Sequence, residues 1–129
     1  WDKVLLVLDL EENRQGKSMS AAEAEAFVQR VVSRARRYPV LYGGPYYLQG
    51  MTMGPGLRSC RLWVSHYTSA SRPMIPRPWK FWALWQYTDG KLGGNPKSVS
   101  GVGNCDINRF NGTESQLRKR WPDLNSEDL

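Results

Sequence analysis

Hydrophobic residues in this chain fall into short runs separated by polar or glycine- and proline-rich segments, a pattern of alternating strands and helices. Residues 3–10 (KVLLVLDL) form an apolar run that ends in acids, which is typical of a strand buried on both faces of a parallel sheet. Ser20 and Glu23 then form an S-x-x-E capping box, and apolar residues follow at helical spacing. We therefore expect a helix over residues 20–38, which ends at Tyr38 because the residue before a proline is disfavoured in the α region.

The remaining segments continue this alternation. Residues 43–58 are rich in glycine, proline, tyrosine and methionine and predict a long loop that can include one helical turn, and residues 69–80 predict a proline-rich surface crossing. Strands separated by helices or long connections indicate parallel pairing, so the predicted fold class is α/β, with residues 1–129 as one domain. The further expected elements are strands over 39–43, 61–67, 81–87 and 104–108 and a helix over 113–121.

Composition and charge narrow the class of protein. The chain is 40% hydrophobic and 23% charged, as in ordinary globular proteins, and it has no apolar run long enough to cross a membrane. No secretory leader pattern precedes the first strand, so we expect the chain to begin inside a domain. The net charge of +6 favours an anionic partner, either nucleic acid or a bacterial wall polymer, although a solvated basic surface explains it equally well.

Two cysteines and one histidine are the only candidate soft metal ligands. Cys60 and Cys105 match no metal-binding spacing, and His66 alone cannot complete a zinc site, so we expect no metal or other cofactor. The two cysteines lie near strands that are not neighbours, which predicts two free thiols.

Asp9 and Glu11 are the first candidate catalytic residues. They lie two positions apart at the carboxyl end of the first strand, so both side chains should project to one face, about 6 to 7 Å apart. Neighbouring carboxylates raise each other's pKa, which keeps one protonated as a general acid, and glycoside hydrolysis requires such a pair. The motif alone favours a structural role, in which one acid caps a helix or pairs with an arginine.

Aromatic side chains near the predicted strand ends are the second signal. Flat aromatic surfaces pack against sugar rings, and ligands of barrel enzymes bind at the carboxyl ends of the strands. Filling of the core is an equally good explanation for any single ring. Asp106, a third acid at a strand end, could cap the helix that follows. The aromatic residues are Tyr42, Trp63, Tyr67, Trp85 and Tyr87.

Taken in order, LDLEEN, YPVLYGG, RLWVSHYTS, FWALWQYTDG and GNCDINRFNG resemble the fourth to eighth strands of the glycoside hydrolase family 25 lysozymes, the N,O-diacetylmuramidases. The motifs D-x-E, W-x-x-x-Y, W-Q-Y and D-x-N-x-F are together far more specific than any one of them. The resemblance implies a partial (β/α) TIM-like barrel of about five parallel strands. It also implies cleavage of the β-1,4 bond between N-acetylmuramic acid and N-acetylglucosamine in bacterial peptidoglycan.

The resemblance also implies roles for individual residues. Glu11 resembles the family's proton donor, and Asp9 resembles its partner, which orients or stabilises the reacting centre. Asp106 matches the acid on the last strand. A carboxylate nucleophile and an acetamido-assisted route both remain open. The positions that match the lining of the saccharide cleft are Tyr42, Trp63, Tyr67, Trp85 and Gln86.

The chain departs from the family at its start, because the family's first-strand D-x-S motif does not occur in it. Strands one to three are therefore expected to be missing, and five strands leave two open edges. We expect a homo-oligomer or another fragment to complete the barrel; a rearranged fold and an inactive product are the alternatives. A catalytically inactive peptidoglycan-binding remnant is the competing function, and nucleic-acid binding is the least favoured. The family implies action outside the cell, at the cell wall, or as a phage-encoded endolysin.

Overall fold

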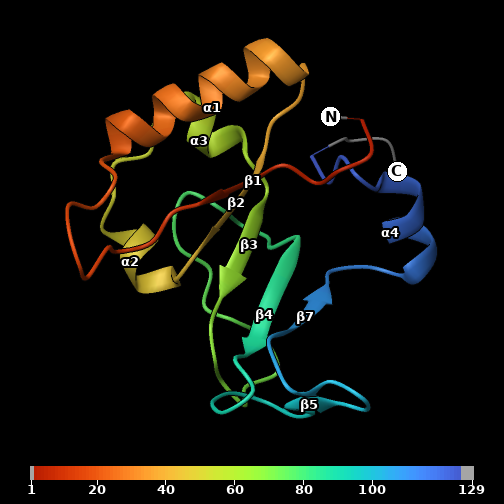
Figure 1. Ribbon diagram of the computed structural model, residues 1–129. Helices are drawn as coiled ribbons and strands as arrows, with labels where there is room; N and C mark the ends of the chain where they lie inside the picture. The colour runs from red at the N-terminus through yellow and green to blue at the C-terminus, as the bar shows by residue number, and fades with distance from the viewer. Residues whose placement is uncertain (1, 126–129) are drawn as a thin grey trace.

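A five-stranded sheet forms the centre of the molecule (Figure 1), and the computed structural model describes residues 2–125. The strand order is β1-β2-β3-β4-β7, so each strand pairs with the next along this sheet. Pairing is parallel from β1 to β4. The strands are β1 (Val7–Asp9), β2 (Val40–Gly43), β3 (Leu62–Ser65), β4 (Leu84–Thr88) and β7 (Ile107–Phe110).

The last strand differs from the sequence-based expectation. Four expected strands are confirmed, and the fifth lies at Ile107–Phe110 instead of 104–108. Because β7 runs antiparallel to β4, parallel pairing of all five strands was wrong. A parallel return needs a crossover, usually a helix, whereas an antiparallel return does not. The connection between β4 and β7 contains only a small hairpin of β5 (Ser98–Val99) and β6 (Gly103–Asn104). The chain therefore leaves β4 and enters β7 at the same end of the sheet.

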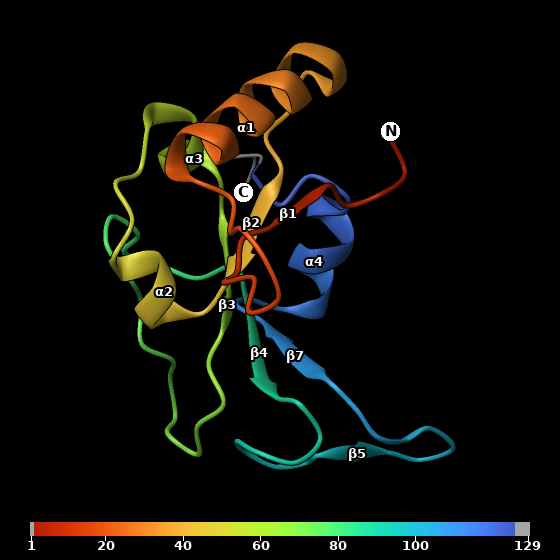
Figure 2. The same cartoon turned by 60° about the vertical axis from the view of Figure 1, so that its left-hand side comes forward.

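Four helices accompany the sheet in the described part of the chain. Figure 2 shows α2 and α3 on one side of the strands and α4 on the other. Residues 43–58, expected to be a long loop that can include one helical turn, contain two short helices, each with a proline in its first turn. The helices are α1 (Ala21–Ala35), α2 (Pro45–Gln49), α3 (Pro55–Ser59) and α4 (Glu114–Arg120).

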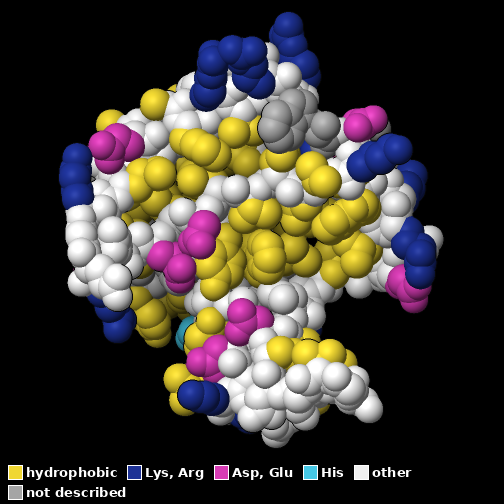
Figure 3. Space-filling view, in the orientation of Figure 1, with side chains coloured by type: hydrophobic (Ala, Val, Ile, Leu, Met, Phe, Trp, Pro, Cys, Tyr) yellow, Lys and Arg dark blue, Asp and Glu magenta, His cyan; other side chains and the backbone are white. Residues whose placement is uncertain are grey.

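The two faces of the sheet differ in character. Leu41 and Leu62 are paired neighbours on one face and pack in the core with Ala24 and Val28 of α1. Because side chains alternate along a strand, the next row of paired residues points to the other face, which we call the open face. Hydrophobic side chains gather over the strands between α1 and the β5–β6 hairpin in Figure 3, with acidic side chains at their edge. The open-face row consists of Asp9, Tyr42, Trp63, Leu84 and Phe110.

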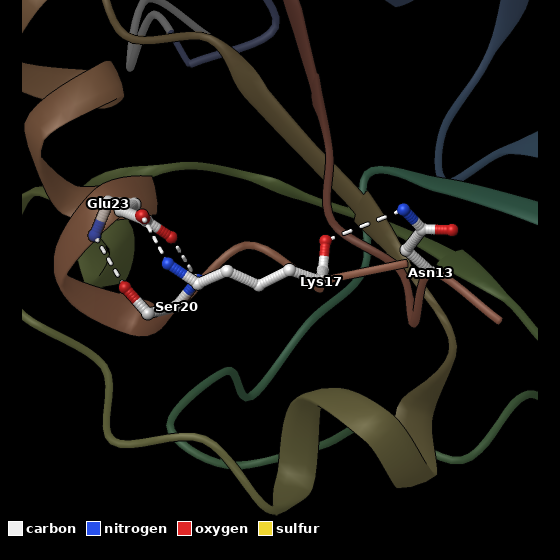
Figure 4. A network of polar contacts seen from close by, with 4 residues as sticks. All are labelled: Asn13, Lys17, Ser20 and Glu23. Atoms are coloured by element: carbon white, nitrogen blue, oxygen red, sulfur yellow. Dashed lines mark hydrogen bonds and ion pairs between the residues drawn. The ribbon is translucent and has the colours of Figure 1, made fainter. Parts of the chain in front are cut away.

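The start of α1 follows the capping box expected from the sequence. The Ser20 hydroxyl accepts a hydrogen bond from the Glu23 N–H at 3.1 Å, and the Glu23 carboxylate accepts one from the Ser20 N–H at 2.8 Å (Figure 4). Lys17 lies 3.3 Å from the same carboxylate. The helix ends earlier than expected, because Arg36 adopts a left-handed conformation (φ 59°) and its N–H bonds to the Val32 carbonyl. This local network fixes where the chain leaves the loop after β1 and enters α1.

Candidate active site

The acid pair lies at the carboxyl end of β1. Asp9 is the last residue of the strand, and Leu10 continues the pairing through its N–H, which donates to the Tyr42 carbonyl at 2.9 Å. Leu8 and Leu10 are buried, whereas Asp9 and Glu11 are exposed. The alternation predicted from the sequence therefore continues past the strand end and places both carboxylates on the open-face side.

The carboxyl group of Glu11 has a raised pKa. Partial burial raises the pKa of the Glu11 carboxyl above its ordinary value of 4.5, and the charge of Asp9 and a hydrogen bond with Asp9 raise it further. The neutral form of Glu11 therefore persists to higher pH than in a free carboxyl. A carboxylic acid beside a carboxylate can donate a proton while its partner remains able to stabilise positive charge.

A cluster of hydroxyl groups surrounds one amide oxygen on the open face. Gln86 is 6% exposed, and its side-chain oxygen accepts hydrogen bonds from the hydroxyls of Tyr42 (2.8 Å), Tyr67 (2.7 Å) and Ser65 (3.3 Å). Burial is the main cause that raises the pKa of Tyr42, and the charge of Glu11 is among the smaller ones. The structure therefore brings the expected site residues Tyr42, Tyr67 and Gln86 into direct contact with one another.

Trp63 extends this surface towards β7. Its ring meets the Tyr42 ring edge-on, with 5.2 Å between centroids, and its indole N–H donates to the Asn108 side-chain oxygen at 2.8 Å. Asn108 pairs with Gln86 across the two strands, so it lies on the open face. The sequence reasoning did not select Asn108, although it is the asparagine of the D-x-N-x-F motif.

Trp85 does not line this surface, so that expectation was wrong. Its side chain is 1% exposed and belongs to the core on the other face of the sheet, where its indole N–H donates to the His66 carbonyl at 2.8 Å. Tyr87 is also buried there, and the Arg109 guanidinium lies over both rings. The reason is geometric: Gln86 points to the open face, so its two neighbours must point away from it.

Asp106 lies directly before β7 and is exposed. Alternation with Asn108 puts its side chain on the open-face side. Within residues 2–125 no hydrogen bond or ion pair joins Asp106 to Asp9 or Glu11. The structure therefore places Asp106 on the same side of the sheet as the acid pair, without a direct link to it.

The cysteines and acids offer no metal centre in the described part of the chain, where no group of three or more histidine, cysteine or acidic residues could hold an ion. Both cysteines are free, Cys60 buried and Cys105 partly exposed. Burial raises the pKa of the Cys60 thiol to about 12, which removes it as a nucleophile near neutral pH. No helix within residues 2–125 is long and apolar enough to span a bilayer.

Paired carboxylates at the carboxyl end of a parallel strand, beside tyrosine and amide side chains, are an arrangement that glycoside hydrolases use. The comparison with protein families agrees with this class: the model of the glycosyl hydrolases family 25 matches residues 2–94. The chain belongs to this family. A search of curated proteins gives no match.

Solved structures of lysozymes share the fold. The chain is 27% identical to a bacterial lysozyme from Streptomyces coelicolor, with a TM-score of 0.64, over 90% of this chain and 58% of that one. It is 27% identical to a family GH25 lysozyme from Aspergillus fumigatus (TM-score 0.61, 93% of this chain and 55% of that one). It is 29% identical to the spore cortex lytic enzyme SleM of Clostridium perfringens, with a TM-score of 0.62, over 88% of this chain and 39% of that one. The chain thus spans little more than half the length of the two lysozymes.

Proposed function

We propose that this chain carries the proton-donating part of a muramidase that hydrolyses the β-1,4 bond between N-acetylmuramic acid and N-acetylglucosamine in bacterial peptidoglycan. The observation that carries the proposal is the Asp9 and Glu11 pair, in which the pKa of Glu11 is raised beside the Tyr42 and Gln86 cluster. Membership of family 25 and the lysozyme neighbours support it.

In this mechanism the protonated Glu11 gives its proton to the glycosidic oxygen as the bond to the anomeric carbon breaks. Asp9 stabilises the positive charge that develops on the sugar, and a water molecule supplies the hydroxyl that completes hydrolysis. A carboxylate nucleophile and assistance by the substrate's acetamido group are both compatible with this arrangement. Asp106 is assigned as the further acid of the site, and Tyr42, Trp63, Tyr67 and Gln86 as the surface that holds the saccharide.

Both carboxylates are exposed to solvent, so the site as it stands does not exclude water. Exclusion of water strengthens charge interactions in an active site, whereas Asp9 and Glu11 are exposed here. We therefore propose that full activity requires a further polypeptide over the open face; a second copy of this chain in that role stays a prediction. The family supports action at the bacterial cell wall, from outside the cell or as a phage-encoded endolysin.

Clearing of a suspension of purified bacterial walls tests the proposal. Wild type should lower the turbidity, and Glu11→Gln should be slower by about 100-fold or more, because the substitution removes the general acid. Glu12→Gln is the matched control, since Glu12 is the next residue and pairs only at 3.9 Å with exposed Arg14. The assay is repeated with an added fragment of the Streptomyces lysozyme, namely the part of it that this chain does not match. If the folded wild type and Glu11→Gln are equally inert with and without this fragment, the catalytic proposal is wrong.

A catalytically inactive wall-binding protein is the second candidate. It is favoured by the exposure of the acid pair together with an intact aromatic and amide surface around Trp63 and Gln86. Sedimentation with insoluble peptidoglycan, with no release of reducing ends, would select this function over hydrolysis.

A further inference from the structure

A polar pocket of about 500 Å³ lies at the amino ends of the central strands. Tyr38, Arg61 and Lys80 line it, and each lies a few residues before one of the strands β2, β3 and β4. Because these strands and β1 run parallel, their amino ends lie at one edge of the sheet and their carboxyl ends at the other. The pocket is therefore at the opposite end of the sheet from Asp9 and Glu11 (Figure 1).

Hydrogen bonds between segments far apart in sequence hold the walls of this pocket. The Asn125 side-chain oxygen accepts a hydrogen bond from the Arg61 N–H at 2.6 Å, and its amide donates to the Tyr38 carbonyl at 2.8 Å. The Trp79 indole N–H donates to the Cys60 carbonyl at 2.7 Å. All five residues line the pocket. A ligand would therefore enter a preformed pocket and would not have to order its walls.

The charge of the pocket is positive. Arg58, Arg61 and Lys80 line it, and no acidic residue within residues 2–125 does. A pocket of this volume is about 8 Å across, less than the screening length of about 10 Å at 0.1 M salt, so the three charges act on one ligand together. Guanidinium groups bind phosphate oxygens in a bidentate manner, and an ammonium group adds a point charge. The pocket therefore suits an anion with several oxygen atoms.

Two of the three cations have no acidic partner in the described part of the chain. Arg61 and Lys80 form no ion pair within residues 2–125. Arg58 differs, because its charge helps to lower the pKa of Glu25, whose carboxylate also accepts hydrogen bonds from the start of α3. We therefore expect Arg61 and Lys80 to contribute most to the binding of an anion.

Aromatic side chains at the same pocket indicate what the anion is attached to. Phe81 lines the pocket and is 70% exposed, and the Trp79 ring is fixed by its bond to Cys60. Flat apolar rings beside cations suit a phosphate ester of a sugar or polyol, whose C–H groups pack on the rings. A nucleic acid strand instead requires a long basic groove with successive stacked bases. One compact pocket therefore favours a polyol phosphate over nucleic acid.

We propose that Arg58, Arg61 and Lys80 bind a phosphate group of an anionic wall polymer, such as poly(glycerol phosphate), with its polyol part against Phe81. The choice of a wall polymer as the source of the phosphate rests on the function proposed above. The chain would then contact the glycan at the carboxyl ends of the strands and the attached anionic polymer at their amino ends.

Isothermal titration calorimetry with an oligomer of glycerol phosphate tests this inference. Wild type should bind the oligomer, and Arg61→Gln combined with Lys80→Gln should weaken binding by about tenfold or more, because two charge-assisted contacts are lost. Arg72→Gln combined with Lys119→Gln is the matched control, since it removes the same charge at exposed positions outside the pocket. The control should change the affinity by about twofold or less. Circular dichroism establishes that each variant is folded.

Two further ligands distinguish the possible sources of the phosphate. Inorganic phosphate should bind more weakly than the oligomer, and Phe81→Ala should weaken the binding of the oligomer but not that of inorganic phosphate. A single-stranded DNA oligonucleotide with the same number of phosphates should also bind more weakly. Equal affinity for inorganic phosphate and the oligomer, or tighter binding of the DNA, would overturn the assignment to a wall polymer.

Absence of oligomer binding, or equal weakening by the pocket variant and its control, would overturn the proposal, since net charge alone would then explain any attraction. Wall clearing is scored separately from binding. If wild type binds the oligomer but clears no walls, the hydrolase proposal fails and this one stands. If wild type clears walls but does not bind the oligomer, only this one fails.

Discussion

Glu11 binds its proton more tightly in the folded protein than in the unfolded chain, because burial and Asp9 raise the pKa of its carboxyl above 4.5. The free energy of unfolding should therefore fall as pH rises from the ordinary pKa through the raised one. Glutamine has no ionisable carboxyl, so Glu11→Gln removes this pH-dependent loss of stability. The variant should be more stable than wild type at neutral pH, by under about 1 kcal/mol because the carboxylate is largely exposed, and no more stable below pH about 4.

Urea denaturation at several pH values measures this effect. Glu12→Gln should show a difference from wild type that does not change across the same pH range. A Glu11→Gln protein that is less stable than wild type at neutral pH would contradict the assigned interaction with Asp9.

Trp63 and Trp85 are the second residues of the neighbouring parallel strands β3 and β4, yet they face different surroundings. Trp85 is buried in the core, so Trp85→Ala should reduce the free energy of unfolding by about 3–5 kcal/mol. Trp63→Ala should cost less stability and should reduce sedimentation with peptidoglycan, because Trp63 lies on the open face next to Tyr42. The reverse order of the two stability losses would show that the faces were assigned wrongly.

The sequence predicted the acid pair better than the aromatic surface. The two-residue period of a strand was sufficient to place Asp9 and Glu11 on one side. The same period forbids Trp85 and Gln86 from sharing a face, and the paired register decided that Gln86 is the one on the open face. Asn108 was identified as a candidate site residue only from its hydrogen bond with Trp63 in the structure.

At the scale of elements, Glu25 shows how one helix stabilises another. Its carboxylate accepts hydrogen bonds from the backbone N–H groups of Gly56 (2.8 Å) and Leu57 (2.9 Å) at the start of α3, and from the Gln29 side chain (2.9 Å). A β-carbon on Gly56 would lie 2.6 Å from a Glu25 carboxylate oxygen, so a larger residue there would displace the carboxylate from this position. The start of α3 is thus capped by α1 and not by a residue near it in sequence.

Glu25→Ala should lower the free energy of unfolding by about 1–2 kcal/mol, because two backbone donors lose their acceptor. Burial alone would raise the pKa of Glu25, but the hydrogen bonds from Gln29, Leu57 and Gly56 and the charge of Arg58 lower it below 4.5. The contribution is therefore present above pH about 4.5 and lost as pH falls through the lowered pKa.

Urea denaturation of Glu25→Ala and of the exposed control Glu12→Ala, at neutral and acid pH, measures this. The control should change stability by about 0.5 kcal/mol or less. Equal stability of the two variants at neutral pH would exclude the capping role.

Sequence patterns predicted α1 and α4 and missed α2 and α3. Capping boxes, which are local sequence signals, mark the starts of α1 at Ser20 and of α4 at Thr113. No side chain hydrogen-bonds as an N-cap at the start of α2 or α3, and Glu25, far away in sequence, supplies the acceptor for α3. Tertiary contacts therefore decide these short helices.

At the scale of the whole molecule, the net charge of +6 should influence binding to bacterial walls. Retention on walls that contain anionic polymers should weaken severalfold as ionic strength rises from about 0.1 M to 1 M, because the screening length falls from about 10 Å to 3 Å. Walls from which the anionic polymers have been extracted serve as the control, and retention on them should change little. Salt-independent retention on the untreated walls would exclude a role for net charge.

The sequence by itself determined the α/β class, the positions of the main strands, the start of α1 and the pairing of Asp9 with Glu11. These follow from local periodicity and capping, which act over a few residues. Only the tertiary structure decided that β7 runs antiparallel, that Trp85 is core and that Asn108 joins the open face. Those features depend on register and on contacts between segments far apart in the chain, which no local pattern specifies.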